Sequence, residues 1–364
     1  MNKEQQILHF IKLNPFISQQ ELAEKVSLSR SAVANYIGNL TKAGKIKGRA
    51  YVLQEDATIL CIGSTNTDRK ARSFEKIHLY ASNPVHTTEF SGGVARNFAE
   101  NLSRLGYETT LISAVGDDKE GHWLLEQTKN QGVDVSQVWV FQTERTGTYT
   151  TLLDHHGETI VAMADMDIYD QITPQMLEEK WSFSSKPKAV FLDMNLSNSC
   201  TKYVIDRCHD EKIPLYISSV SAAKVVKLPE DLTGVDLLLI NEEEIKALTG
   251  ANIASIEDCH ALCETLHKRG VEKIIVQLEN NELYYFSEEE YGHLQPFITD
   301  GVDFTGTNDA FSACAIYSIF NGETFKKACQ FGLAGAALTA QTDQSVSVQL
   351  QLENIEKILA QFTS

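Results

Sequence analysis

The chain has 364 residues, of which 43% are hydrophobic and 22% are charged, and its formal net charge at pH 7 is −17. This ordinary composition excludes a fibrous or disordered polymer, and the lack of a long apolar run or secretory signal predicts a cytoplasmic protein with no membrane partner. The seven cysteines include no CxxC pair, so we expect reduced thiols.

Residues 1–53 differ in charge from the rest of the chain. They include eight lysines or arginines and three glutamates, which give +5, so the remaining residues carry −22. A basic segment joined to an acidic body predicts two functions in one chain.

Three helices and a short hairpin are expected in this basic segment. Apolar residues at helical spacing predict a first helix at residues 7–13, and Ser18–Glu21 is a capping box that opens a second. A third helix begins at Ser29 or Arg30, and residues 46–53 predict a small wing. The segment resembles a winged helix-turn-helix, whose third helix enters the major groove of DNA.

The resemblance implies a DNA-binding surface. Side chains near the start of the third helix would contact bases or phosphates, namely Ser29, Arg30, Ser31 and Asn35. Basic side chains further along would neutralise phosphates, namely Lys42, Lys45, Lys47 and Arg49. The alternative is a helical appendage that only mediates dimerisation.

Two polar stretches follow near the start of the larger segment. Asn66 and Asp68 come after an apolar run that predicts a buried strand. Gly92 and Gly93 precede an apolar helix with Asn97 in its first turn. Paired glycines allow a ligand to approach the backbone closely, or they simply join a strand to a helix.

Short apolar runs then alternate with helical patterns. The runs at residues 109–115, 189–192, 215–217 and 237–240 predict strands, the last three of them parallel strands of a βαβ sheet. A hairpin is expected at residues 148–164. Ligands of such sheets lie at the carboxyl ends of the strands.

The most informative stretch runs from residue 299 to residue 311. A polar, turn-forming segment leads into a buried apolar helix. The first amides of this helix, at Gly306, Thr307 and Asn308, would form an anion hole for a phosphoryl group. Asp309 could accept a proton from an attacking hydroxyl, or it could be only a helix cap.

These stretches together resemble the ribokinase (PfkB) family of carbohydrate and nucleoside kinases over roughly residues 57–350. The C-terminal signature of that family is in register at Asp303, Thr305, Gly306, Asp309, Ala310 and Phe311. Family motifs also match at residues 63–68, 92–97 and 241–244. The resemblance implies an α/β fold, a three-layer αβα sandwich with a small β lid at about residues 69–90 and 146–165.

The resemblance also implies roles for individual residues. Asp309 would be the catalytic base, and ATP would supply the phosphoryl group. Mg²⁺ would be held through Asn241 and Glu244; the alternative is a simple acidic helix start, but the position directly after a strand end favours the metal site. The sugar or nucleoside would be bound by Asn66, Asp68, Gly92, Gly93, Asn97 and Asp165.

Some residues suggest a substrate, and others depart from the family pattern. Residues 152–154, 157–158, 165–166 and 193–197 are similar to the pseudouridine kinase branch, which makes pseudouridine the expected substrate. Glu279 and Glu282 stand where the family has glycines beside the nucleotide, and Ser218–Ser219 replaces Asp-Pro. Asn308 also replaces a glycine, and asparagine is the non-glycine residue that best tolerates a positive φ.

Two functional hypotheses follow. The first is a two-domain protein, with a DNA-binding module at residues 1–53 and a kinase at residues 57–364, expected to form a homodimer. The second is a ligand sensor in which a kinase-derived body with weakened catalysis regulates transcription. The replaced glycines favour the sensor, whereas the retained Asp309 favours the kinase.

Overall fold

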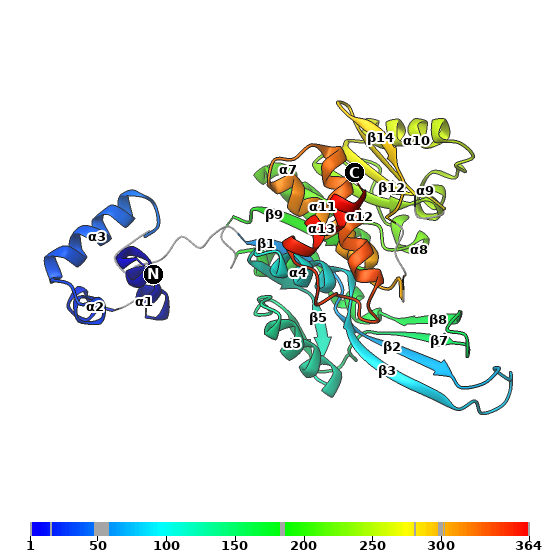
Figure 1. Ribbon diagram of the computed structural model, residues 1–364, viewed down its shortest axis with the longest axis horizontal. Helices are drawn as coiled ribbons and strands as arrows, with labels where there is room; N and C mark the ends of the chain where they lie inside the picture. Colours follow the sequence, from blue (N-terminus) through cyan, green and yellow to red (C-terminus); the bar gives the residue numbers. More distant parts are fainter. Residues whose placement is uncertain are drawn as a thin grey trace. The chain divides into compact units, whose positions relative to one another are not determined.

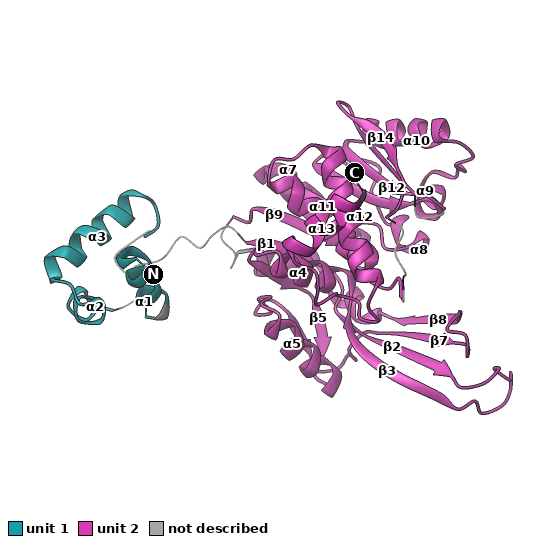
Figure 2. Cartoon of the chain, in the orientation of Figure 1, with its two compact units in different colours: residues 1–57 teal, residues 58–364 magenta. Residues whose placement is uncertain are grey.

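The computed structural model describes residues 2–14, 17–46, 58–182, 186–279, 282–297, 301 and 303–362. The chain divides into two compact units, Met1–Ala57 and Thr58–Ser364 (Figure 2). Each unit is described on its own.

The described part of the first unit consists mainly of the helices α1 (Lys3–Leu13), α2 (Gln19–Val26) and α3 (Arg30–Lys42). Each begins after a polar cap, and the predicted capping box of α2 is confirmed. One apolar face of each helix enters a shared core that includes Ile7, Ile11, Leu22, Val26, Val33, Ile37 and Leu40. Residues 47–53 of the predicted wing lie outside the described residues.

An eight-stranded sheet forms the centre of the second unit, in the order β14-β13-β12-β11-β10-β9-β1-β4. The six strands from β12 to β4 in this order run parallel, and β13 and β14 are antiparallel additions at one edge. The strands are β1 (Ile59–Ile62), β4 (Thr109–Ile112), β9 (Ala189–Asp193), β10 (Leu215–Ser218), β11 (Val235–Asn241), β12 (Val271–Gln277), β13 (Leu283–Ser287) and β14 (Tyr291–Leu294).

Helices pack on both faces of this sheet, as Figure 1 shows. Alternate side chains of β1 enter opposite cores, with Ile59 and Cys61 in one and Leu60 and Ile62 in the other. The first core is covered by α4 (Val94–Arg104), α11 (Thr307–Phe320), α12 (Phe325–Ala340) and α13 (Leu352–Phe362). The second is covered by α6 (Pro174–Ser182), α7 (Asn198–Glu211), α8 (Ala222–Val225), α9 (Glu242–Thr249) and α10 (Ile256–Lys268).

A separate four-stranded sheet forms the lid, in the order β3-β2-β7-β8. Its strands are β2 (Asn66–Ser73), β3 (Val85–Gly92), β7 (Thr148–Leu153) and β8 (Thr159–Asp165). The antiparallel pair β7–β8 is the predicted hairpin. The three-layer αβα sandwich with a small β lid is therefore confirmed.

One predicted strand is wrong in extent. The run at residues 109–115 is divided into β4 and β5 (Ala114–Gly116), and β5 pairs with β6 (Trp139–Phe141). The unit also contains α5 (Lys119–Asn130), which lies between β5 and β6 in the chain, and the short helix η1 (Asp167–Gln171). The break falls at Ser113, whose hydroxyl donates to the carbonyl oxygen of Gly63 at 2.5 Å. Ser113 therefore bonds to the residue that follows β1 and belongs to neither β4 nor β5.

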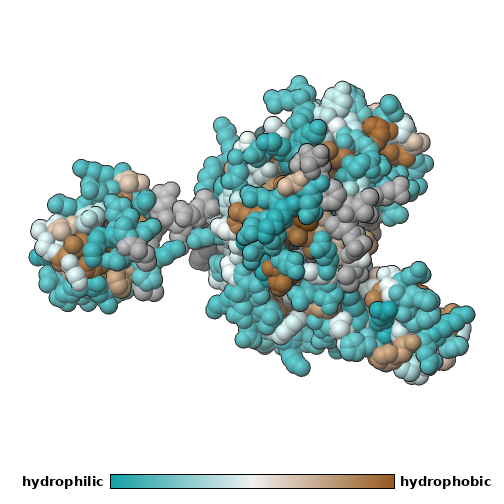
Figure 3. Space-filling model, in the orientation of Figure 1, coloured by the Kyte–Doolittle hydropathy of each residue, from teal (hydrophilic) through white to brown (hydrophobic). Residues whose placement is uncertain are grey.

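The surface is mainly hydrophilic on the face of the molecule shown in Figure 3, with small separate hydrophobic areas. The lid carries several exposed large apolar side chains, namely Phe74, Leu79, Tyr80, Ile160 and Met163. Within the described residues, every helix is too short or too polar to cross a bilayer.

Candidate active site

A cavity of about 860 Å³ opens at the carboxyl ends of the parallel strands. Residues that end or follow four neighbouring strands line it, namely Ser64 after β1, Asn195 after β9, Ser218 in β10 and Asn241 in β11. The first turn of α11, part of α12 and the lid strands complete the wall. This is the position that the parallel topology predicts for a ligand site.

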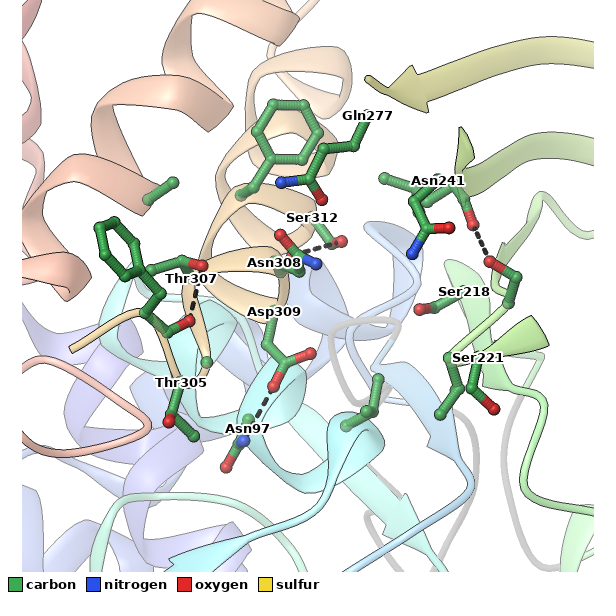
Figure 4. A pocket seen from close by; sticks show the side chains of 18 of the residues that line it. Asn97, Ser218, Ser221, Asn241, Gln277, Thr305, Thr307, Asn308, Asp309 and Ser312 are labelled. Carbon is green, nitrogen blue, oxygen red and sulfur yellow. Dashed lines mark hydrogen bonds between the residues drawn. The ribbon is translucent and has the colours of Figure 1, made fainter. Parts of the chain in front are cut away.

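Asp309 lies in the first turn of α11 and lines the cavity with 8% of its surface exposed. Its carboxylate accepts a hydrogen bond from the side-chain amide of Asn97 at 2.8 Å (Figure 4). Burial, with smaller contributions from Asp193 and Asp68, raises the pKa of Asp309 to about 8. Among the described residues this carboxylate makes no capping bond to the backbone of α11. A pKa close to neutral pH suits a group that accepts a proton during catalysis.

The start of α11 presents free backbone donors to the cavity. Gly306 adopts the left-handed conformation with φ 78°, and the amides of Asn308 and Asp309 have no acceptor among the described residues. The amide and hydroxyl of Thr307 both donate to the carbonyl oxygen of Phe304. Asn308 has no positive φ, so its replacement of glycine strains nothing in the backbone.

The lid strand β2 carries Asn66 and Asp68 into the cavity. The amide of Asn66 donates to one oxygen of Asp68 at 2.7 Å, and the hydroxyl of Ser345 donates to the other at 3.0 Å. Burial raises the pKa of Asp68, although both hydrogen bonds oppose the shift. The pair presents oxygen and nitrogen atoms suited to the hydroxyls of a sugar.

The predicted substrate-binding residues differ in position. Gly93 lines the cavity, but Gly92 does not, because it packs against Asp68, whose carboxyl group would collide with any Cβ at that position. Asp165 is exposed at the end of β8 and is not part of the wall. Its neighbours Ala164, Met166 and Asp167 line the cavity instead.

Sequence reasoning assigned no role to Asp193, a completely buried residue at the end of β9. One of its oxygens accepts hydrogen bonds from the amide and hydroxyl of Ser64, both at 2.7 Å, and from the amide of Ala95 at 3.0 Å. The other oxygen accepts hydrogen bonds from the backbone amide and the side-chain amide of Asn195. Asp193 therefore joins the ends of β1 and β9 to the start of α4. Its place directly after an apolar run, and its membership of the stretch 193–197 that resembles the pseudouridine kinase branch, gave no sign of this structural role.

Arg96 was also missed, and it fixes the orientation of Asn97. The guanidinium donates to the side-chain oxygen of Asn97 at 3.0 Å, and is itself paired with Glu100 inside α4. Since a guanidinium can only donate, the Asn97 oxygen must face Arg96 and its NH₂ group must face Asp309.

Asn241 and Glu244, the predicted metal ligands, both line the cavity. They form the capping box of α9, and one oxygen of Glu244 accepts the amide of Asn241 at 2.8 Å and the hydroxyl of Ser219. Burial raises the pKa of Glu244. The second oxygen has no hydrogen-bond partner among the described residues, so the pair fits Mg²⁺ that keeps most of its ligands from phosphate and water.

The two glutamates that replace family glycines do not line the cavity. Glu282 accepts hydrogen bonds from Gln295 at 3.1 Å and from His293 at 2.8 Å, and these lower its pKa. The amide of Glu279 donates to Glu242 at 3.2 Å. The carboxylate of Glu282 is thus held against β14 and is not part of the cavity wall. Asn280 and Asn281 lie outside the described residues.

The DNA-binding candidates lie on and after α3. Ser29 caps the helix through the amide of Ala32 at 3.2 Å and shares a hydrogen bond with Ser31. The predicted residues in the described part are all exposed, namely Ser29, Arg30, Ser31, Asn35, Lys42 and Lys45. Lys47 and Arg49 lie outside the described residues.

Comparison with known proteins agrees with this fold, which is that of a ribokinase-like α/β protein. Residues 56–350 match the pfkB family carbohydrate kinase model, and residues 2–47 match a winged helix-turn-helix DNA-binding model. The chain therefore belongs to the pfkB carbohydrate kinase family and carries an N-terminal winged helix-turn-helix segment.

Individual relatives make the similarity more specific. The chain is 31% identical to the uncharacterized sugar kinase YeiI of Escherichia coli strain K12, covering 97% of each chain. It is 30% identical to the pseudouridine kinase of the same organism, covering 83% of this chain and 96% of the relative. The fold matches Arabidopsis thaliana ribokinase complexed with ribose and ATP, with a TM-score of 0.71 and 21% identity over 84% of this chain and 99% of that one.

Proposed function

We propose that the protein is an ATP-dependent kinase that phosphorylates a primary hydroxyl group of a sugar or nucleoside, with pseudouridine as the first candidate. The observation that carries this proposal is the buried Asp309 beside the free amides at the start of α11. A carboxylate and an anion-binding helix start in one cavity suit phosphoryl transfer. The likeness to a pseudouridine kinase supports the choice of substrate.

The proposed reaction uses these groups in sequence. Asp68 and Asn66 hold the sugar, and Asn97 holds the carboxylate of Asp309 toward the reacting hydroxyl. The hydroxyl oxygen attacks the terminal phosphorus of ATP, its proton passes to Asp309, and the bond to the ADP oxygen breaks. The amides of Asn308 and Asp309 stabilise the negative charge of the transferring group. Mg²⁺, held through Glu244 and Asn241, would neutralise charge on the phosphates.

The sensor hypothesis rested on the replaced glycines and has lost some of its support. Glu282 is held away by His293 and Gln295, and the backbone of Asn308 is unstrained. We therefore favour an active kinase. The homodimer and the cytoplasmic location stay predictions.

The direct test is ADP release by the full chain with Mg²⁺-ATP and one candidate substrate at a time. Pseudouridine, uridine, ribose and adenosine are offered at pH 8.5, where Asp309 is largely deprotonated. We expect turnover with pseudouridine at least about tenfold faster than with the others, since a site that hydrogen-bonds its substrate rejects analogues strongly. If none of the four causes ADP release, although the protein is folded and still binds one of them, the sensor hypothesis is supported.

We further propose that residues 1–53 bind DNA through α3 and the residues that follow it. Binding should weaken steeply as the salt concentration rises, because each phosphate contact releases counterions. Lys42→Gln should lower the slope of log affinity against log salt by about one on every DNA sequence. Lys129→Gln on α5 is the matched control, an exposed lysine of the other unit. Binding by fluorescence anisotropy that is insensitive to salt would rule the DNA proposal out.

A further inference from the structure

The cavity contains many acidic groups and few basic ones. Four carboxylate side chains line it, those of Asp68, Asp167, Glu244 and Asp309. Among the described residues of the wall, Lys224 is the only lysine or arginine. A nucleoside triphosphate carries more negative charge than one Mg²⁺ neutralises, so a site that binds it against these carboxylates needs a cation.

Other basic residues near the site are already bonded to protein oxygens. Lys70 is paired with Asp303, Arg96 is paired with Glu100, and Lys227 donates to the carbonyl oxygen of Leu196 at 3.1 Å. The ammonium group of Lys224 makes no hydrogen bond or ion pair with any described residue. Lys224 is therefore the one basic group of the cavity wall that is free to bind a ligand, within the part of the chain that the structure describes.

The backbone that carries Lys224 is firmly held. The amide of Ser219 donates to the carbonyl oxygen of Leu239 at 3.1 Å, and its hydroxyl donates to the same atom at 2.9 Å. The amide of Lys224 donates to the carbonyl oxygen of Ser221 at 2.9 Å, and the next side chain, Val225, is buried in the core. The lysine thus projects from a fixed position in α8, the short helix that follows β10.

The turn before Lys224 is strained. Val220 has φ 68°, and a β-branched residue rarely adopts this left-handed conformation. Such strain persists only where the surroundings enforce it, and it concentrates at ligand sites. Val220 itself lines the cavity, together with Ser218 and Ser221. The strained turn therefore belongs to the cavity wall and leads directly to Lys224.

The same wall faces the proposed base. In Figure 4, Ser218 and Ser221 lie on the side of the cavity opposite Asp309 and Asn308. A phosphoryl group between the two sides would meet the free amides of α11 on one side. On the other it would meet the hydroxyl of Ser221, which caps no backbone amide, and the ammonium group of Lys224.

We propose that Lys224 binds the polyphosphate of the nucleotide and remains in contact with the terminal phosphoryl group as it is transferred. This inference rests on the proposed kinase function and adds to it a residue whose positive charge offsets the negative charge of the phosphates. Lys224 would compensate for the negative charge of the carboxylates that line the cavity.

The test compares three variants of the full chain. Lys224→Gln removes the charge and keeps most of the side-chain length, and Lys224→Arg keeps the charge. Lys246→Gln removes the same charge from an exposed lysine of α9 that is not part of the cavity wall. Binding of ATP, ADP and adenosine is measured by calorimetry in the presence of Mg²⁺, and kcat and KM are measured for both substrates.

We expect Lys224→Gln to weaken ATP binding at least about tenfold and to leave adenosine binding within about twofold, because only the phosphates lose a charged partner. For turnover, kcat/KM for ATP should fall about tenfold to hundredfold, with KM for the sugar or nucleoside unchanged. Lys224→Arg should restore most of the ATP affinity, and Lys246→Gln should behave as the unaltered protein.

The possible outcomes separate this inference from the kinase proposal. If no substrate is phosphorylated but ATP binding still depends on Lys224, the inference stands and the kinase function fails. If turnover is present and Lys224→Gln binds ATP normally, the inference fails and the kinase stands. The inference is also overturned if the unaltered chain does not bind ATP, or if Lys224→Gln loses affinity for the sugar or nucleoside instead.

Discussion

Asp309→Asn is expected to reduce turnover at least about a thousandfold while the protein still binds ATP and its sugar or nucleoside. A positioned general base contributes roughly 10²- to 10⁴-fold, and the amide of asparagine cannot accept the proton. The replacement is nearly isosteric, and its carbonyl oxygen can still accept the hydrogen bond that Asn97 now donates at 2.8 Å. ADP release and direct binding, measured on the same preparation, check the two halves of this expectation. A variant with more than a tenth of normal activity would show that Asp309 is not the base.

The thermal stability of the same variant serves as its folding control. An aspartate in the unfolded chain has a pKa of about 4, whereas burial raises that of folded Asp309 to about 8. Between these values only the folded state keeps the proton, so the stability of the protein falls as the pH rises through this range. Asp309→Asn removes that loss. Without ligands, its Tm should exceed that of the unaltered protein by about 3 °C or more at pH 8.5 and by much less at pH 5.

Gly306→Ala is expected to have a comparable effect by a different cause. Gly306 has φ 78°, and a Cβ at this position would overlap the backbone carbonyl oxygen of Ser345. Because backbone atoms cannot move aside as a side chain can, the start of α11 must shift and the anion-binding amides move with it. Displacing one such donor commonly costs about 10²- to 10³-fold in kcat, and we expect a loss in this range.

Gly322→Ala provides the matched control. Gly322 lies just beyond the other end of α11 with φ 79°, and no atom lies within 4 Å of a Cβ built there. Both substitutions therefore carry the same backbone strain of about 1 kcal/mol, and only Gly306→Ala adds the collision. If Gly322→Ala lowers kcat as much as Gly306→Ala does, strain in α11 and not the collision with Ser345 limits the reaction.

Much of the architecture could be predicted because it depends on local pattern. The capping box at Ser18 and the polar turn before α11 are signals spread over a few residues, and the structure contains both. The apolar runs of β9, β10 and β11 are equally local, since a strand buried on both faces must be apolar along its length.

The parts that could not be predicted depend on contacts between distant residues. Asp193 bonds to Ser64 and Ala95, which are 129 and 98 positions away, and Asp68 bonds to Ser345, 277 positions away. Nothing close to Asp193 in the sequence shows that it joins the ends of β1 and β9 to the start of α4. Lys224 was missed for the same reason, because its isolation becomes visible only when its neighbours in space are known.

The strand β8 has a consequence for how such proteins diversify. It is exposed along its whole length, from Thr159 to Asp165, yet it leads directly to Met166 and Asp167 at the cavity. Substitutions on an exposed strand change the free energy of folding little, whereas burial makes most of the sandwich intolerant of change. Substitutions in β8 can therefore alter the cavity rim at Met166 and Asp167 while the residues proposed for phosphoryl transfer stay fixed, so a change of substrate would carry little risk to the fold.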